Sequence, residues 1–514
     1  MRIWAVVTSA ILAWCALALS QGTGGGGKSA SSVILPPPKP LQLPRAGEKF
    51  VDPTFGTEIL RVTDRGDAEQ ATHAYSLWSA FNCTNTRFIV HLSNADWTLY
   101  DFEPGAFASK KVRRVCCPPG GATLNLENSM WHPTDPDTLY ALEPSSERRR
   151  LFAYNVTTQQ YKLVHDFTGA VATGGYPNSL SMSEDGRYLG FYASRTGGQD
   201  TGEIAVVYNV QTQAVYTYDF GVRKAVRNIH SMFIDKTGSY AVIQAGYPSE
   251  GKTILWVWNF GFGSVEPLVF NSSDRPGGHF VLGKSAMINP DGWEGNRFLF
   301  RSLVSPHAWR PVFVIPRKGG LIQYQTDSHS SMNQSDPRFY IWSNYTASRL
   351  TSWQPHSGKI FKAPGFTRVS LGHLPPDGVR QNGVDLAKAL GIPSARGQWW
   401  YDARADTLFV WLDGDADPRD PKMYVVPFDW RPFQDEIVQV WTDSPNNLTK
   451  VRRLAHHQSH WANTSTYLDG PRASIDRSGR YVIFTSNWGG SGHRDVFVLR
   501  ISQTPRGAGV VREP

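Results

Sequence analysis

The stretch Asn178–Phe191 reads Asn-Ser-Leu-Ser-Met-Ser-Glu-Asp-Gly-Arg-Tyr-Leu-Gly-Phe, and it decides the fold. A polar residue and a serine open a short strand, a polar turn containing glycine follows, and a second apolar strand leaves that turn. The same order of residues returns from His230 to Ile243 and from Pro471 to Phe484. Weaker copies begin near Tyr75, Asn128, Lys284 and His329.

The spacing of these copies predicts the architecture. The aligned serines recur 45 to 54 residues apart between Ser129 and Ser330. A period of this length made only of strands is typical of a β-propeller blade, because one four-stranded sheet cannot bury both faces without neighbours. Seven copies therefore predict seven blades, and 47 Gly, 34 Pro and 12% aromatic residues agree with an all-β chain.

The two ends of the repeat region predict how the ring closes. Residues Thr57–Asp64 form one strand-like run before the first repeat, and the last repeat supplies only three strands before Ile501. A strand from the N-terminus would complete the last blade and leave no exposed sheet edge. The fold class is accordingly predicted as all-β, a seven-bladed β-propeller closed by an N-terminal strand, with an insertion in blade six.

The segments outside the repeats predict the domain organisation. Residues 1–20 have the basic start, apolar core and small residues of a secretory signal peptide, which predicts a secreted or periplasmic protein. Residues 21–47 are rich in Gly, Ser and Pro and are expected to be a flexible linker. The propeller would span 48–504 and a short tail 505–514. No other stretch is long and apolar enough to span a membrane.

Blade six is predicted to be interrupted. Its second strand would end near residue 346 and its third strand would be Lys422–Val426, which leaves 347–421 as an insertion. Within it, Gln398–Asp402 and Thr407–Trp411 flank a polar turn and predict a β-hairpin. An eighth, irregular blade is the alternative interpretation.

Three cysteines follow the signal segment. In an oxidising compartment, a disulfide from Cys83 to either Cys116 or Cys117 is the favoured interpretation. Metal binding or nucleophilic catalysis is less favoured, because no second Cys-x-x-Cys pattern accompanies them.

The mouth of the central channel, where the first strand of each blade begins, is the expected functional region. The repeat alignment places polar or basic residues there instead of small or apolar ones, and His230 and His329 are suited to proton transfer near neutral pH. For the serine that follows each position, hydrogen bonding at the strand start is the favoured role. The ring consists of Tyr75, Asn128, Asn178, His230, Lys284, His329 and Pro471, with His73 and Arg472 adjacent.

A second histidine cluster precedes the last blade. On an extended segment His456, Gln458 and His460 would share one face, which makes them weak candidates for a divalent metal site. A solvated loop is the favoured alternative, because no acidic or cysteine ligand lies at metal spacing. No metal or other cofactor is therefore predicted.

The charge balance indicates the class of ligand. The chain has 52 Lys and Arg against 44 Asp and Glu, a net charge of +8, and a pI near 9.2. An exported basic protein would attract an acidic polysaccharide or oligosaccharide. Nucleic acid is not expected as a partner, because no basic run or nucleic-acid motif appears.

The Asp-Gly-Arg-Tyr turns and the run Val482–Trp488 resemble those of TolB-type propellers and, among enzymes, of oligogalacturonate lyases, over roughly residues 57–502. The lyases hold a divalent metal with a glutamine and a His-Pro-His sequence before the last blade. By position, Tyr467 replaces that glutamine, and Gly470 and Arg472 replace the two histidines. The metal motif of the lyases is therefore not retained.

The departure leaves a metal-independent route open. β-Elimination of a uronate polymer needs a cation for the carboxylate, a base for the proton at C5 and an acid for the leaving oxygen. We expect a secreted, monomeric polysaccharide lyase. The candidate catalytic residues are His230, His329, Tyr467 and Arg472, and the candidate substrate-binding residues are His73, Tyr75, Asn128, Asn178, Lys284 and Trp461.

The alternative is a non-catalytic secreted propeller that binds glycans or proteins. Its contact surface would be the aromatic insertion with Trp399, Trp400 and Trp411, because indole rings stack on sugars and anchor protein interfaces.

Overall fold

The computed structural model describes a large part of the chain. The described residues are 41–93, 96–115, 129–143, 150–168, 171, 178–193, 203–224, 229–245, 254–268, 280–290, 297–303, 309–314, 327–336, 338–345, 353–366, 376, 378–381, 384–419, 425–428, 435–442, 451–459, 467–489 and 491–502.

Six of the sheets in these residues have four antiparallel strands, as the repeats predict. Sheet 1 contains β3 (Ala71–His73), β4 (Arg87–Leu92), β5 (Asp96–Glu103) and β6 (Ala108–Val115). Sheet 2 contains β7 (Ser129–Trp131), β8 (Thr138–Leu142), β9 (Arg150–Asn155) and β10 (Gln160–Asp166). Sheet 3 contains β11 (Asn178–Met182), β12 (Tyr188–Ala193), β13 (Ile204–Asn209) and β14 (Val215–Asp219), followed by the short helix α2 (Phe220–Lys224).

The next three sheets continue this order. Sheet 4 contains β15 (Ile229–Ile234), β16 (Ala241–Ala245), β17 (Ile254–Asn259) and β18 (Ser264–Leu268). Sheet 5 contains β19 (Val281–Leu282), β20 (Ala286–Pro290), β21 (Arg297–Ser302) and β22 (Trp309–Val314). Sheet 6 contains β23 (Asp327–Ser331), β24 (Phe339–Tyr345), β33 (Glu436–Trp441) and β34 (Val451–His456). Consecutive four-stranded sheets of this kind are consistent with a β-propeller.

Sheet 7 combines both ends of the described chain. It contains β35 (Ser474–Ile475), β36 (Tyr481–Ser486), β37 (Asp495–Arg500), β2 (Glu58–Arg61) and β1 (Lys49–Val51). The N-terminal strand β2 pairs with β37 as the sequence predicts, with Leu60 opposite Val498. β1 then adds a fifth strand on the outside.

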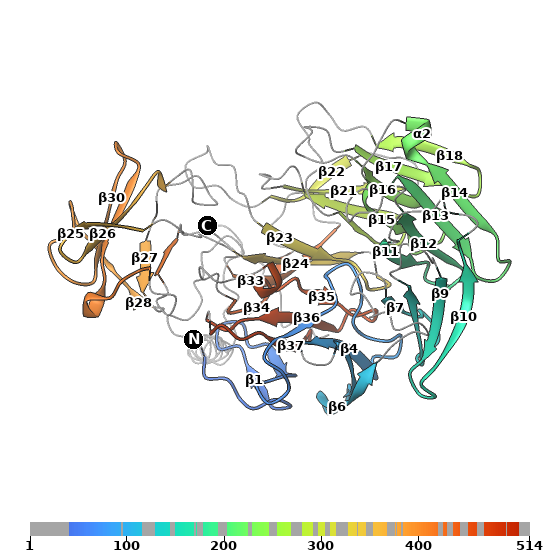
Figure 1. The fold of residues 1–514 in the computed structure, drawn as a ribbon, viewed down its shortest axis with the longest axis horizontal. Helices are drawn as coiled ribbons and strands as arrows, with labels where there is room; N and C mark the ends of the chain where they lie inside the picture. Colours follow the sequence, from blue (N-terminus) through green and yellow to red (C-terminus); the bar gives the residue numbers. More distant parts are fainter. Residues whose placement is uncertain are drawn as a thin grey trace, which may run out of the picture.

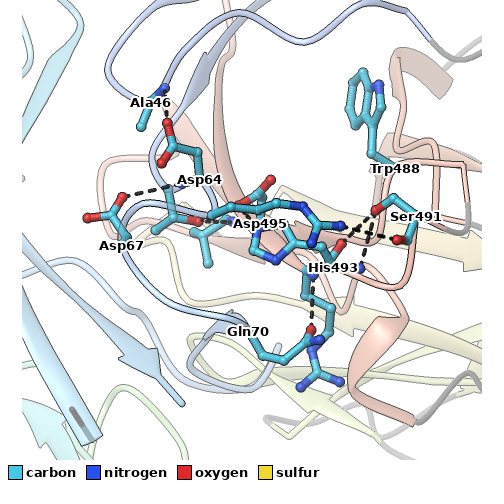
Figure 2. A network of polar contacts seen from close by, with 12 residues as sticks. Ala46, Asp64, Asp67, Gln70, Trp488, Ser491, His493 and Asp495 are labelled. Atoms are coloured by element: carbon cyan, nitrogen blue, oxygen red, sulfur yellow. Dashed lines mark hydrogen bonds and ion pairs between the residues drawn. The ribbon is translucent and has the colours of Figure 1, made fainter. Parts of the chain in front are cut away.

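A polar network reinforces the junction between the two ends (Figure 2). The Asp495 carboxylate accepts hydrogen bonds from Thr63 Oγ1 at 3.0 Å and from Arg61 at 2.7 Å. His493 Nε2 lies 3.0 Å from the same carboxylate. Asp495 and Thr63 are buried, so these contacts fix the junction where solvent screens them little.

The repeated turn explains how neighbouring sheets are joined. Asp235 Oδ1 accepts the backbone N–H groups of Ser239 and Tyr240, both at 3.0 Å, which closes the turn between β15 and β16. Its second oxygen accepts the N–H of Ser285 from sheet 5 at 3.2 Å. Gly238 has φ of 72°, a conformation that favours glycine at this turn position.

The same device recurs between sheets 7 and 1. Asp476 accepts the backbone N–H groups of Arg480 and Tyr481, and its other oxygen accepts Asn85 Nδ2 at 2.6 Å. The aspartate that closes each of these turns, three residues before the turn glycine, is therefore also a contact between sheets.

The interruption in sheet 6 is longer than predicted. β24 pairs with β33, whereas β32 (Val425–Phe428) pairs with β27 (Gly378–Gln381). The prediction that Lys422–Val426 is the third strand of blade six is therefore wrong. Both stretches alternate apolar residues, and only the pairing partner distinguishes them.

The intervening segment has sheets and a core of its own. One sheet contains β25 (Gln354–Ser357), β26 (Ile360–Pro364), β31 (Thr407–Trp411), β30 (Gln398–Asp402) and β29 (Ala387–Lys388). The other contains β27, β28 (Val384–Asp385) and β32, and a short 3₁₀ helix, η2 (Asp413–Asp415), follows β31. The predicted hairpin is confirmed as β30 and β31.

Figure 1 places β25, β26, β27, β28 and β30 at one end of the molecule, opposite sheets 2 to 4. A separate cluster that includes Trp399, Leu408 and Val410 forms the core of this insertion. In the described part of the chain, no helix has the length and apolar character needed to cross a membrane.

Candidate functional site

A segment of sheet 1 leaves its strand ladder and contacts five other sheets. His73 pairs with Val90 and Phe81 pairs with Phe88, so residues 74–80 stand opposite a single residue of β4. Such an excess cannot remain in the ladder and must bulge out of it. We call residues 74–80 the channel segment. Its members Ala74, Tyr75, Ser76, Trp78 and Ala80 are buried.

Trp78 provides several of these contacts. Its indole Nε1 donates to the carbonyl of Leu180 in sheet 3, and its ring centroid lies 5.6 Å from that of Phe233 in sheet 4. Its own carbonyl accepts the hydroxyl of Ser474 in sheet 7 at 2.7 Å. From sheet 2, Trp131 Nε1 donates to the carbonyl of Ala80 at 2.7 Å. Through Trp78 and Ala80, the channel segment therefore lies between sheet 1 and sheets 2, 3, 4 and 7 and contacts each of them.

Tyr75 carries the contact to sheet 6. Its hydroxyl lies 2.8 Å from Nε2 of His329, and the two rings meet edge to face with centroids 5.1 Å apart. His329 is 1% exposed and Tyr75 is 7% exposed. A phenol and an imidazole at this distance can exchange a proton, so the structure brings together two of the predicted site residues as a candidate acid–base pair.

His73 is held in a neutral state on the adjacent strand. Its Nδ1 lies 2.7 Å from the Thr485 hydroxyl and its Nε2 lies 2.8 Å from the Arg472 carbonyl. Complete burial and the nearby Arg472 charge lower the pKa of His73 to about 3. Both ring nitrogens are engaged by protein groups, so His73 holds strands together.

Arg472 is buried beside this histidine. Its guanidinium donates to the Thr72 hydroxyl and, at 3.4 Å, to the carbonyl of Leu468, and its side chain is among the largest that are fully buried. A guanidinium cannot ligate a metal, because it offers no lone pair. The residues present therefore do not fit the divalent metal that the lyase resemblance implies at this position.

The alignment placed Lys284 incorrectly. Lys284 lies between β19 and β20, in the turn that follows the first strand of sheet 5, and its Nζ lies 3.5 Å from Glu184 in the corresponding turn of sheet 3. The prediction that Lys284 belongs to the strand-start ring is wrong, because the Lys-Ser-Ala pattern imitates a strand start within that turn.

Of the remaining predicted site residues, some are described by the structure and others lie outside the described residues. His230 lies near the start of β15 and is half-buried, and its carbonyl accepts the Tyr192 hydroxyl at 3.2 Å. Asn178 is the first residue of β11, and Tyr467 is the first residue of the 3₁₀ helix η4 (Tyr467–Asp469). For these two residues the structure describes only the backbone. Outside the described residues lie Asn128, His460, Trp461, Cys116 and Cys117, together with the predicted disulfide and the segments 1–40 and 503–514.

Serines in the first strands of two sheets join neighbouring sheets. Ser331 Oγ accepts the N–H of Ile475 at 3.1 Å, and Ser181 Oγ accepts the N–H of Ile234 at 2.9 Å. Ser331 ends β23 and Ser181 lies near the end of β11, so these two serines do not cap strand starts. Of the aligned serines for which hydrogen bonding at the strand start was predicted, Ser231 donates to Gln244 Oε1 at 3.1 Å.

The geometry expected for the weak metal candidates is not present. β34 ends at His456, and Gln458 has φ of 55°, so the segment does not continue in the extended form that would align them on one face. The His456 ring packs against Phe55 at 4.9 Å, and its Nε2 lies 3.9 Å from Glu436. Among the described residues, no group of three or more His, Cys, Asp or Glu side chains has a metal-binding arrangement.

The sequence patterns did not predict a role for Trp78, nor that the channel segment leaves the ladder of sheet 1. The signal in the sequence is that the copy near Tyr75 is a weak one, in which Phe88 follows Ser76 by 12 residues, whereas Tyr188 follows Ser179 by 9. The patterns also missed Lys236 and Arg477, because these residues follow the first strands of sheets 4 and 7 and lie away from the strand starts.

Comparisons with known proteins support the fold alone. No protein-family model matches the chain, and no curated protein matches it. Among solved structures, oligogalacturonate lyase from Vibrio parahaemolyticus matches with a TM-score of 0.52 and 10% identity, covering 90% of this chain and 99% of that one. TolB from Acinetobacter baumannii matches with a TM-score of 0.30 and 13% identity, covering 55% of this chain and 62% of that one. The chain thus has an all-β, propeller-type fold similar to that of the lyase.

Proposed function

We propose that the protein is a secreted polysaccharide lyase that cleaves an acidic, uronate-containing polysaccharide by β-elimination. The observation that carries the proposal is the 2.8 Å contact between the Tyr75 hydroxyl and Nε2 of His329. The scaffold is a seven-bladed ring in which β2 completes the last blade. The similarity in fold to an oligogalacturonate lyase supports this choice of chemistry as an analogy.

Each group in the pair has a defined role in the proposed reaction. His329 accepts the proton from C5 of the uronate, and the electron pair of that C–H bond forms the C4=C5 double bond. The C4–O bond breaks, its electron pair leaves with the oxygen, and Tyr75 donates a proton to that oxygen. The hydrogen bond between the two side chains then returns the proton from His329 to Tyr75.

Positive charge supports the binding of an acidic substrate. The net charge of +8 attracts a polyanion, and Arg472 contributes a buried guanidinium beside the strand carrying His73. Because Arg472 already donates to Thr72 and Leu468, its contribution is a fixed positive potential. A positive potential stabilises the charge that develops on the substrate carboxylate during proton removal.

The rival function, a non-catalytic glycan- or protein-binding propeller, is favoured by a different observation. Tyr75, His329, His73 and Arg472 are all buried, as expected for structural residues. In the insertion, Trp400 stacks on Phe409 with centroids 5.4 Å apart, on a face where Trp400 is only half-buried. Trp399 is 1% exposed and belongs to the insertion core, so it does not form part of such a contact surface.

The experiment that separates the two functions is an absorbance assay. The purified mature protein is incubated with a panel of acidic polysaccharides, with and without a chelator. A chelator-insensitive rise in ultraviolet absorbance, from the unsaturated uronate product, would support the lyase. If no polymer gives a rise while one is retained in an affinity assay, the non-catalytic function replaces it.

Export is part of the same proposal and has its own test. Expression of the full chain in a host with a secretory pathway should yield a protein that lacks residues 1–20, recovered from the medium or periplasm. Mass spectrometry of the intact protein measures this. Recovery of the uncleaved chain from the cytoplasm would contradict export.

A further inference from the structure

A cavity of about 120 Å³ lies where the first strands of several sheets end. Trp78 of the channel segment and Trp131, which ends β7, both line it. Of the described residues, Tyr75 and His329 are not among those that line it. The cavity is therefore distinct from the Tyr75–His329 pair, although Trp78 packs against Tyr75 with ring centroids 5.8 Å apart. A ligand site here does not rest on the proposed lyase function.

Most of the cavity wall is apolar. Trp78, Trp131 and Phe233 contribute aromatic surface, and Leu282 and Met332 contribute aliphatic and thioether surface. A mostly apolar enclosure with a small number of convergent polar groups is the usual composition of a small-molecule site.

The polar groups of the cavity carry an excess of positive charge. Lys236, Arg477 and Glu184 line it, and Lys284 lies beside them. Glu184 is 3.3 Å from Arg477 and 3.5 Å from Lys284, so one carboxylate already serves two cations. Lys284 is exposed, so the excess charge of the cavity lining itself comes from Lys236 and Arg477 against Glu184, and such an excess is costly beside a mostly apolar wall.

Lys236 is held by backbone carbonyls, and Glu184 is the negative group that acts on it. Its Nζ donates to the backbone carbonyls of Met332 and Gln334, both at 2.7 Å. An ammonium has three N–H donors, and within the described part of the chain these two bonds leave one for a ligand. The carbonyls fix the direction of the ammonium, and Lys236 lines the cavity.

We propose that this cavity binds a small organic carboxylate, with its apolar body between Trp78 and Trp131 and its carboxylate group on Lys236. The carboxylate neutralises the excess charge and takes the remaining N–H of Lys236. The apolar walls select an organic anion over inorganic phosphate, which would leave most of the cavity without favourable contacts.

The first test compares two probes of the same shape. Binding of 4-fluorobenzoate and of neutral 4-fluorobenzyl alcohol to the full mature protein is followed by ¹⁹F NMR. We expect the carboxylate to bind saturably and at least tenfold more tightly than the alcohol. Equal affinity of the two probes, or no saturable binding of the carboxylate, would overturn the proposal without requiring any variant.

The second test locates the site. In Lys236→Met, which keeps an unbranched side chain only one atom shorter and removes its charge, the affinity for 4-fluorobenzoate should fall at least tenfold. The matched control is Lys359→Gln, an exposed lysine in the insertion, which changes the net charge equally and should leave the affinity unchanged. Equal loss in both variants would assign binding to net charge and overturn the proposal. Loss of lyase activity in either variant has no bearing on it.

Discussion

The Tyr75 hydroxyl lies 2.8 Å from Nε2 of His329, although the two residues are 254 positions apart in the chain. Tyr75 reaches this position because the channel segment leaves the ladder of sheet 1. The contact therefore depends on an irregularity in one repeat and on the first strand of another. It places the two groups needed for general acid–base chemistry within one hydrogen bond of each other.

Removing either member of this pair should abolish elimination without unfolding the protein. In Tyr75→Phe the leaving oxygen loses its proton donor, and in His329→Gln the base is lost. We expect kcat on the cleaved polysaccharide to fall about 100-fold or more in each. The measurement is the initial rate of the rise in absorbance.

Matched controls remove the same groups elsewhere. Tyr240→Phe changes a half-buried turn residue of sheet 4, and His356→Gln changes an exposed residue of the insertion. Both should retain the activity of the unmodified protein. Full activity in Tyr75→Phe and His329→Gln, with the fold intact by circular dichroism, would refute the assignment of the pair.

His73 should make the protein less stable in acid. Its pKa in the folded protein is lowered to about 3 from 6.5 by burial, so below pH 6.5 the unfolded chain binds a proton that the folded protein excludes. The stability that His73 contributes is complete above pH 6.5 and is lost as the pH falls toward 3. Urea unfolding at pH 7.5 and 4.5 measures it.

A variant isolates this effect from other groups. Glu436 acts in the opposite direction, because burial raises its pKa to about 7 and its contribution grows as the pH falls from 7 toward 4.5. His73→Gln retains a donor and an acceptor but does not titrate. It should lose less stability than the unmodified protein between the two pH values, and an equal loss would contradict the prediction.

Trp78→Ala should strongly destabilise the protein. The substitution removes the ring that packs on Phe233 and the donor to Leu180, and it leaves a cavity between sheets. The expected loss is about 3–5 kcal/mol in the free energy of unfolding. Denaturant unfolding provides the measurement, with the half-buried Trp400→Ala as the control. A loss under about 1 kcal/mol would mean that the channel segment does not hold the sheets together.

Replacing the insertion by a tight turn should leave the sheets intact. β24 and β33 are antiparallel neighbours, with Ser343 opposite Ile437, and the insertion has its own core. A short Gly-rich hairpin between residues 345 and 436 is therefore expected to preserve lyase activity within about twofold of the unmodified protein, because Tyr75 and His329 lie outside the replaced segment. Loss of polysaccharide retention with an intact fold would favour the rival function.

The affinity of the cavity for 4-fluorobenzoate should decrease as the pH rises from 6.5 to 8.5. Burial, and then the Arg477 charge, lower the pKa of Lys236 to about 7 from 10.5, while Glu184 acts in the opposite direction. Above pH 7 the ammonium loses its proton and the anion loses its partner. We expect about a tenfold weaker affinity at pH 8.5, measured by ¹⁹F NMR titration.

The other groups that face Lys236 do not produce this change. Burial lowers the pKa of His132 and raises that of the Cys83 thiol, and the pKa of Glu184 is lowered, which moves each away from the interval in question. Arg477 and Lys284 are the remaining cations nearby. A constant affinity across the interval, or the same decrease in Lys236→Met, would contradict the role of Lys236.

Local patterns predicted the regular parts of the fold. The turn residues around Asp235 and Asp476 identified the strand pairs that follow them, because a carboxylate closing a turn and a glycine with positive φ are requirements of the turn itself. The hairpin of β30 and β31 was recognised for the same reason. These features depend on residues within a few positions of one another.

Two predictions, for Lys284 and for residues 422–426, were wrong because each stretch has the same local sequence pattern as a different element of the fold. Lys284 followed by Ser285 looks like a strand start, but Lys284 lies in a turn. The stretch 422–426 looks like a third strand of blade six, but Val425 and Val426 pair with β27 inside the insertion. Alternation of apolar residues indicates a strand but does not specify its partner. The choice of partner is a property of the assembled sheets.

The sequence by itself determined the all-β class and the period of the repeats, because both follow from local patterns that recur along the chain. It also predicted that an N-terminal strand pairs with the last sheet, because the last repeat supplies only three strands. Only the tertiary structure decided that His73 and Arg472 are buried, that Tyr75 meets His329, and that Lys236 lines a cavity with Arg477. Burial and contact between residues hundreds of positions apart depend on how the sheets pack, and side-chain pKa values follow from that packing.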